Sequence, residues 1–426
     1  MIAILGGGIS GISSGYHLSI KNQDSIVYES RQSWGGLLDN FTIGEGFLFD
    51  YFVHLSLTEN NYVKDLFAKS TPFFKHNPES VNYYKGYWLK HPAQNNLAPL
   101  AAEEKVKIII DFINRPHIEQ INNYEEWLLA QYGHYFSSNF PSVYTLKYWT
   151  TEASKLTTDW VGNRFSLPPI ENLLKGAFNE QDENFYYAKE MRYPQKGGFK
   201  SFLNYMVQNV NIQLNKKAIL IDLKKKKIYF SDDSEIQYEK LISSIPLPEL
   251  IKIIKDAPNK VKNAASKLNS TSGQLVSLGF NRPNVSPKMW FYIYDIDIEP
   301  ARAYSPSIKS PNNAPLNKSS LQFETYYSNY RPKRMNGDNL IEHIIRKGES
   351  MNLFSKKDIE VCDYREVKYA NVIFDKERIR NLEIVKLYLK DNEIYTCGRF
   401  GEWEYYWTDQ SLISGKKTAD EILTGN

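Results

Sequence analysis

The start of the chain carries the pattern that most constrains its fold. The apolar run 1–5 has the length of a strand, and a G-x-G-x-x-G sequence follows it at once. After a helical pattern of apolar residues, a second apolar run ends at Glu29, 18 residues beyond Gly11. Such glycines permit a tight turn and a close backbone approach to a pyrophosphate, and an acid at this spacing suits a ribose hydroxyl. A dinucleotide is therefore expected at the start of the helix, on Gly6, Gly8, Ile9, Ser10, Gly11 and Glu29.

The residues after Glu29 favour FAD over NAD. The segment E-S-R-Q-S-W-G-G, residues 29–36, resembles the E-x(5)-G-G extension of FAD proteins of the glutathione-reductase type, which include the amine-oxidase superfamily. A second glycine pair permits another close backbone approach beside the pyrophosphate. The alternative is a surface turn after a NAD-type unit. The FAD interpretation adds the expected contacts Ser30, Arg31, Gly35, Gly36 and Leu37.

Composition excludes several classes of function. The 426 residues suffice for two or three domains. The net charge of +3 is too small to indicate a nucleic-acid partner, and the run Lys224–Lys227 is predicted to be a solvated hairpin tip. No apolar stretch approaches the roughly 18 residues of a membrane span, and with a strand starting at Met1 no signal peptide is expected. Cys362 and Cys397 are the only cysteines and lack metal-site spacing, which is typical of a reduced, cytoplasmic compartment.

The order of the patterns predicts one cofactor domain interrupted by two insertions. The first insertion reads mainly as helices and the second as alternating strands. The span 300–320, rich in Pro, Asn and Ser, is predicted to be loop. Strand, glycine turn and helix return at the end of the chain. The expected fold class is α/β: a glutathione-reductase-type FAD-binding Rossmann domain (1–95, 186–260 and 346–426), a helical domain (96–185) and an antiparallel β-sheet domain (261–345).

Six further segments each carry a recognisable motif. Residues 397–409 read C-G-R-F-G-E-W-E-Y-Y-W-T-D, and residues 85–97 read K-G-Y-W-L-K-H-P-A-Q-N-N-L. Residues 49–54 end in a histidine, residues 160–164 read W-V-G-N-R, and W-F-Y at 290–292 precedes A-R-A at 301–303. Taken in their order along the chain, the segments resemble those of flavin-dependent UDP-galactopyranose mutases, members of the amine-oxidase-like FAD superfamily, over nearly the whole chain.

This resemblance implies an isomerase that exchanges the pyranose and furanose forms of a nucleotide-diphosphate sugar. Reduced flavin N5 is then the nucleophile at the anomeric carbon. FAD is expected without covalent attachment, with NADH or NADPH as the reductant. The implied setting is cell-surface polysaccharide biosynthesis, and a homodimer is compatible with it.

The resemblance also implies roles for single residues. The catalytic set is His54, Arg302 and Arg399, because planar guanidinium groups bind phosphate through paired, charge-assisted hydrogen bonds. The alternatives are an interior histidine with satisfied hydrogen bonds, ion-paired arginines and tyrosines that only pack the core. Substrate is expected on Arg164, Tyr292, Arg302, Arg399 and Tyr405, and the end of the chain adds the cofactor contacts Gly398, Arg399, Asp409, Gln410 and Ser411.

Departures from the motifs leave the substrate open. Val53 stands where the mutases usually carry glycine, His91-Pro92-Ala93 replaces their Y-P segment, and their base-binding segment is not recognisable. The nucleotide or the sugar can thus differ from UDP-galactose. Another hypothesis is an oxidoreductase of the amine or protoporphyrinogen oxidase type, and a third is a flavoprotein that only binds a partner. An arginine-lined cleft between the domains, with an aromatic base end, favours the mutase, whereas a mainly apolar or aromatic-caged cleft favours the oxidase.

Overall fold

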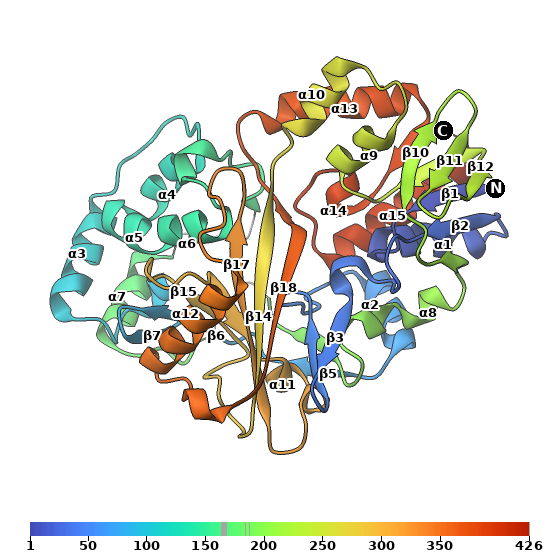
Figure 1. Ribbon diagram of the computed structural model, residues 1–426. Helices are drawn as coiled ribbons and strands as arrows, with labels where there is room; N and C mark the ends of the chain where they lie inside the picture. Colours follow the sequence, from blue (N-terminus) through green and yellow to red (C-terminus); the bar gives the residue numbers. More distant parts are fainter. Residues whose placement is uncertain (163–167, 184, 187, 426) are drawn as a thin grey trace.

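The computed structural model describes residues 1–162, 168–183, 185–186 and 188–425 (Figure 1). A parallel sheet with its helices lies on the right in Figure 1, a group of helices lies on the left, and long antiparallel strands run between them. The expected α/β class, a parallel Rossmann-type sheet combined with an antiparallel sheet, is confirmed.

The parallel sheet forms around the first strand of the chain. It holds, in spatial order, β19 (Ile394–Thr396), β13 (Lys240–Ser243), β1 (Ile2–Leu5), β2 (Ser25–Tyr28) and β9 (Ile212–Gln213). The side chains of β1 are buried along its whole length, because helices cover both faces of such a sheet. Helix α1 (Ile9–Ser19) leaves β1 and packs against α15 (Thr408–Thr424).

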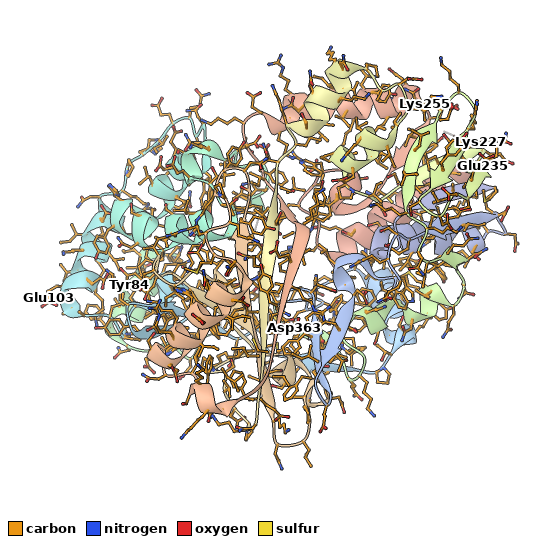
Figure 2. All side chains as sticks on the ribbon, in the orientation of Figure 1. Tyr84, Glu103, Lys227, Glu235, Lys255 and Asp363 are labelled. Atoms are coloured by element: carbon orange, nitrogen blue, oxygen red, sulfur yellow. The ribbon has the colours of Figure 1, made fainter. Side chains whose placement is uncertain are left out.

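Smaller elements surround the parallel sheet. Lys224, Lys225 and Lys226 lie in the hairpin turn between β10 and β11, as predicted, and Lys227, the first residue of β11, forms an ion pair with Glu235 at the outer edge (Figure 2). A three-stranded sheet is formed by β10 (Ala218–Asp222), β11 (Lys227–Phe230) and β12 (Glu235–Gln237). Two further pairs of strands are β3 (Asn40–Ile43) with β4 (Phe47–Asp50), and β5 (Phe73–His76) with β8 (Met191–Pro194). The helices are α2 (Asn61–Ser70), α8 (Asn204–Val207), α9 (Leu247–Ile253), α10 (Asn259–Ser266), α13 (Arg378–Asp391) and α14 (Gly398–Gly401).

Helices fill the described part of the range 96–185. They are α3 (Ala102–Ile113), α4 (Tyr124–Tyr132), α5 (His134–Asn139), α6 (Pro141–Tyr148) and α7 (Ile170–Phe178). Two contacts fix this group on the antiparallel sheet. The Tyr84 hydroxyl donates to Glu104 over 2.7 Å, and buried Lys147 donates to the carbonyl of Ile293 over 2.7 Å. Helix α6 is therefore held beside β15.

The antiparallel region is a seven-stranded sheet within the described residues. Its spatial order is β18 (Ile359–Val372), β14 (Ser270–Phe280), β17 (Ser319–Tyr327), β16 (Arg302–Tyr304), β15 (Trp290–Ile293), β6 (Ser80–Tyr84) and β7 (Tyr87–Lys90), with β6 parallel to β15. Helices α11 (Pro306–Lys309) and α12 (Gly337–Ser350) flank it.

Two sequence expectations differ from this sheet. The sheet takes β6, β7 and β18 from ranges expected in the cofactor domain, because long-range strand pairing is invisible in local pattern. The prediction of loop throughout 300–320 was wrong, since Arg302 stands on β16. There it is paired with Tyr292 on one side and Glu324 on the other. The polar residues that suggested a loop instead cap short helical elements: Ser305 caps α11, and Ser310 caps the 3-10 turn that follows it.

A buried ion pair anchors the end of β4. Asp50 and Lys309 have no exposed side-chain surface, and their Oδ2 and Nζ atoms lie 2.6 Å apart. The Tyr193 hydroxyl and the backbone N–H of Phe199 also donate to this carboxylate. A buried charge needs such partners to offset its lost hydration. These contacts fix the position of Asp50 and therefore of the start of the segment that follows it, residues 51–57.

Candidate functional site

The first glycine turn has no room for side chains. A Cβ on Gly11 would lie 1.9 Å from the carbonyl oxygen of Gly6, and a Cβ on Gly36 would lie 3.0 Å from the Cα of Gly8. The Gly35 N–H donates to the Gly7 carbonyl over 2.7 Å, which joins the two glycine pairs. Helix α1 starts without a side-chain cap or an acid in its first turn. Its first N–H groups can therefore bind an anion, as a dinucleotide pyrophosphate requires.

Glu29 is built into the same turn. Its carboxylate is 6% exposed and accepts from the Gly7 N–H over 2.7 Å and from the Arg31 N–H over 2.9 Å. The Ser30 hydroxyl donates to it, and the Arg31 guanidinium donates to the carbonyl of Gly36. Together with the bare glycine backbone, this arrangement fits the pyrophosphate and ribose of FAD.

The other predicted cofactor residues come from the end of the chain. Gly398 approaches α1 so closely that a Cβ there would lie 2.2 Å from the Ser10 hydroxyl. Asp409, Gln410 and Ser411 form the first turn of α15, which packs against α1. The structure therefore brings the start and the end of the chain together at one cradle, which we define as residues 6–11, 29–37, 398 and 409–411.

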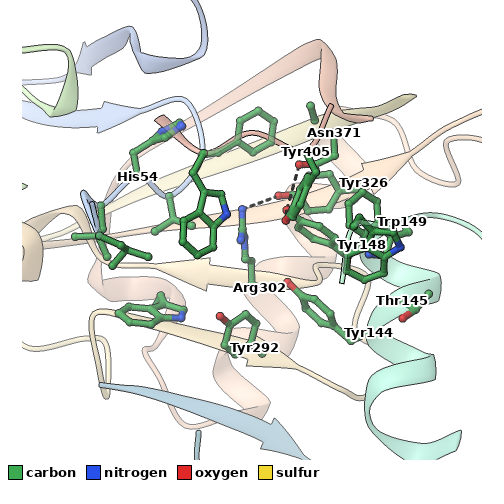
Figure 3. Close-up of a pocket in the computed structure, with 18 of the residues that line it drawn as sticks. His54, Tyr144, Thr145, Tyr148, Trp149, Tyr292, Arg302, Tyr326, Asn371 and Tyr405 are labelled. Atoms are coloured by element: carbon green, nitrogen blue, oxygen red, sulfur yellow. Dashed lines mark hydrogen bonds between the residues drawn. The ribbon is translucent and has the colours of Figure 1, made fainter. Parts of the chain in front are cut away.

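A cavity of about 320 Å³ extends from this cradle. Leu37 and Asp409 line it on the cradle side, and Figure 3 shows its other walls. These walls come from β15, β16 and β17, from α6, and from residues 52–57. The described lining thus includes residues of all three regions of the fold.

Arg302 stands at the middle of the cavity (Figure 3). Its Nε lies 2.5 Å from Glu324, whose side chain has no exposed surface, and one terminal nitrogen donates to the Tyr326 hydroxyl over 3.1 Å. Burial opposes the charge, but Glu324 and nearby tyrosines hold the pKa of Arg302 well above its ordinary value. Glu324 also accepts the Val53 N–H over 2.6 Å. One carboxylate therefore fixes both the arginine and the segment that leads to His54.

Arg399 is a second cation on the cavity. Its Nε donates to the carbonyl of Tyr406 over 2.8 Å, and one terminal nitrogen reaches the carbonyl of Ala370 at 3.4 Å. Among the described residues it has no carboxylate within ion-pair distance. Neutral carbonyls orient this guanidinium without cancelling its charge, so the cavity can bind an anion between Arg302 and Arg399.

His54 lies at the opposite end of the cavity from Tyr148 and Trp149 (Figure 3). Burial lowers its pKa to about 3, so the ring is neutral near pH 7. Its Nδ1 is buried and has no hydrogen-bond partner among the described residues. An unpaired buried polar atom is costly, and a cofactor edge placed there would supply the missing partner.

Tyrosines and tryptophans make up much of the remaining wall. The ring of Tyr292 packs edge-on against Tyr144. The Tyr405 hydroxyl lies 3.3 Å from that of Tyr148, and Trp149 packs against the Tyr405 ring. Both tyrosines predicted to bind substrate, Tyr292 and Tyr405, therefore line the cavity, and their ring packing is present as well. Arg164 lies outside the described residues.

Several cavity residues were missed by sequence reasoning. Glu324 has a recognisable signal, because it is the single charged residue in the alternating segment 319–327. Tyr144 and Tyr148 are spaced four apart on α6, which reads equally well as core packing. His91 was noted only as a departure from a motif, yet it lines the cavity.

Other classes of site find no support in the described part of the chain. No group of His, Cys, Asp and Glu there is placed to hold a metal ion. No helix there combines the length and apolarity that a bilayer crossing needs.

Comparisons with known proteins match this chain to flavin-containing proteins, which agrees with a cradle suited to FAD. Residues 9–423 match the family model described as flavin containing amine oxidoreductase. A structure of reduced UDP-galactopyranose mutase is 25% identical, with a TM-score of 0.93 over 100% of this chain and 96% of the other. A protein from Exiguobacterium sp. 255-15, provisionally assigned as a protoporphyrinogen oxidase, is 13% identical, with a TM-score of 0.76 over 100% and 99% of the two chains. A fatty acid isomerase from P. acnes is 11% identical, with a TM-score of 0.68 over 99% and 98%, and these last two matches show the fold alone.

Proposed function

Since this chain belongs to the family of flavin-containing amine oxidoreductases, we propose that it is an FAD-dependent mutase that interconverts the pyranose and furanose forms of a nucleotide-activated sugar. One observation carries the proposal: Arg302 and Arg399 face the same cavity beside the cofactor cradle, and Arg399 has no acidic partner among the described residues. Two guanidinium groups on one cavity, Arg302 paired with Glu324 and Arg399 without an acid, suit a diphosphate. The full-length similarity to a UDP-galactopyranose mutase supports this interpretation.

The cradle and the cavity divide the work. The cradle binds FAD through the glycine turn, Glu29 and the start of α15, and the reduced flavin supplies a nucleophilic nitrogen for the anomeric carbon. Arg302 and Arg399 bind the diphosphate and stabilise the charge that develops on it as the glycosidic bond breaks. They also keep the diphosphate in place for recombination with the sugar.

The surroundings of the arginines suit this role. Glu324 fixes Arg302 in one orientation, so little side-chain entropy is lost on binding. Neutral His54 can exchange a hydrogen bond with the cofactor edge without adding charge. The aromatic wall limits access of water, which strengthens the electrostatic interactions inside.

The test uses purified protein reduced with dithionite and supplied with UDP-galactopyranose and other nucleotide sugars. We expect a furanose product by chromatography, activity only with reduced flavin, and no net consumption of reductant. Equal turnover by oxidised protein would contradict the proposal.

One observation favours an oxidase instead. Tyr144, Tyr148, Tyr292, Trp149 and Trp160 line the cavity, and an aromatic cage suits the cation of an amine or an apolar ring system. An oxidase would reduce oxygen and release peroxide in proportion to substrate. Peroxide assays with amines and with protoporphyrinogen therefore distinguish the two functions.

A further inference from the structure

The end of the cavity next to His54 differs in chemistry from the rest. Its wall is formed by Val53, Leu55, Leu57, Met191 and Trp290, which we call the apolar lobe. Met191 and Trp290 belong to a buried cluster on which Val53, Leu55 and Leu57 pack. Three of these five side chains carry no hydrogen-bonding group, Met191 offers only a weak sulfur acceptor, and Trp290 carries an indole N–H.

The polar groups around this lobe are mostly engaged already. Burial raises the pKa of Tyr292, and the neighbouring polar side chains of Trp290 and Tyr186 partly oppose this rise. The amide nitrogen of Asn82 donates to the carbonyls of Leu89 and Lys90, so its oxygen faces the Nδ1 of His91 at 3.1 Å. Nδ1 must then carry the proton of His91, since burial lowers the pKa of this ring to about 4. Nε2 is left as a hydrogen-bond acceptor on a histidine that lines the cavity.

The order of the lining residues along the cavity indicates which part of a bound nucleotide sugar contacts the apolar lobe. In Figure 3, His54 lies on one side of Arg302, and Tyr148 and Trp149 lie on the other. A diphosphate on the arginines directs the nucleoside toward the aromatic side and the sugar toward His54. The sugar therefore contacts the apolar lobe and the one free acceptor of His91.

We propose that the sugar is a 6-deoxyhexose, whose C6 methyl group packs on the apolar lobe while a ring hydroxyl donates to His91. This inference rests on the proposed mutase function and deepens it. A C6 hydroxyl in this lobe would lose its hydration without gaining a hydrogen-bond partner, which disfavours it. A pentose would leave the space of the methyl group empty and lose its dispersion contacts.

The reaction remains balanced with this substrate. A 6-deoxyhexopyranose keeps its O4 hydroxyl, which is the oxygen that closes the furanose ring. The bond from C1 to O5 is exchanged for a bond from C1 to O4, and one proton moves from O4 to O5. No oxidant or reductant is consumed in the exchange.

The test compares sugars that differ by one oxygen atom. UDP-galactopyranose is paired with UDP-6-deoxygalactopyranose, and the same two sugars are tested on dTDP. We measure kcat/KM with dithionite-reduced holoenzyme and the dissociation constant with oxidised holoenzyme by calorimetry. We expect the 6-deoxy sugar to be favoured by about ten- to a hundredfold, the range in which an apolar pocket rejects an added hydroxyl.

Each result decides between the two proposals. Equal use or preference of the 6-hydroxy sugar overturns the 6-deoxy inference and leaves the mutase function standing. If none of the four compounds is bound or converted, the mutase function falls and the inference with it.

A variant sharpens the result. Leu57→Asn places a hydrogen-bond donor in the apolar lobe and should reduce the preference for the 6-deoxy sugar over the 6-hydroxy sugar. Leu316→Asn, at a side chain that is 89% exposed, should leave this preference unchanged. An unchanged preference in a folded Leu57→Asn protein would count against the lobe as its source. If that variant does not fold, the ratio measured on the native chain decides alone.

Discussion

The cofactor cradle and the substrate cavity adjoin each other but are built by different means. The cradle relies on backbone: glycines that leave no room for a Cβ, a helix start and one acid from the next strand. The cavity relies on side chains from strands and helices far apart in sequence, such as Arg302, Tyr148 and Arg399. Backbone geometry tolerates almost no substitution, whereas a side-chain wall can change its ligand one residue at a time. The cradle is therefore expected to determine whether the protein binds FAD, and the cavity what it acts on.

The strongest test of this division is a single methyl group in the cradle. In Gly11→Ala the new Cβ would lie 1.9 Å from the Gly6 carbonyl, which is backbone and cannot yield cheaply. We expect loss of bound FAD, measured as the flavin-to-protein absorbance ratio after gel filtration. Gly86→Asn is the control, because nothing lies within 4 Å of a Cβ there and Asn tolerates a positive φ. A fully yellow Gly11→Ala protein would show that the cradle is less rigid than it looks.

The next largest effects are expected in the cavity. Arg302→Ala and Arg399→Ala each remove charge-assisted bonds to a diphosphate, worth about 1.5–3 kcal/mol, so activity should fall roughly ten- to a hundredfold or more while FAD is retained. Only Arg302→Ala also leaves Glu324 buried without its cation, and it should cost about 3–5 kcal/mol of unfolding free energy. Steady-state kinetics and urea denaturation separate the two effects. Release of FAD from either variant would place that arginine in the cradle instead.

A smaller effect is expected from the one acid of the cradle. Glu29→Gln keeps the shape of the side chain but removes the charge next to the Gly7 N–H. FAD affinity should weaken about tenfold, the value of a charged hydrogen bond, while kcat with saturating FAD should stay near the native value. Fluorescence titration of apoprotein measures the affinity. A change in kcat alone would mean that Glu29 acts on the cavity.

The smallest effect concerns acidity and again falls on the cavity. Burial lowers the pKa of His54 to about 3, so the unfolded chain binds a proton below about pH 6.5 that the folded chain refuses. Stability contributed by the neutral ring is present above that pH and is lost as the pH falls towards 3. His54→Gln should therefore show a shallower fall of Tm between pH 6.5 and 4 than the native protein. The exposed His134→Gln serves as the matched control, and equal slopes in all three proteins would contradict the assignment.

The two regions also differ in how far the sequence predicts them. The first part of the cradle, residues 6–11 and 29–37, is predicted from local pattern, because strand, glycine turn, helix and acid lie within 36 residues. Its part from the end of the chain was expected only through a resemblance. Arg302 and Arg399 were placed only through a resemblance. The strand that carries Arg302 was mistaken for loop, since its pairing with β15 and β17 depends on residues elsewhere in the chain. Glu324 and the tautomer of His91 depend on contacts in three dimensions, which no spacing in the sequence reports.

The position of β1 within its sheet has a consequence for biosynthesis. Its neighbour β13 pairs with β19 at residues 394–396, and α1 packs against α15 near the end of the chain. At ribosomal rates of about 5–20 residues per second, roughly 20–80 s separate the emergence of β1 from that of β19. During that interval the nascent chain exposes the apolar edge of an unfinished sheet, and chaperones have time to bind it. Capture of flavin is therefore expected only after β19 and α15 have emerged, which makes cofactor supply a control point for the yield of folded protein.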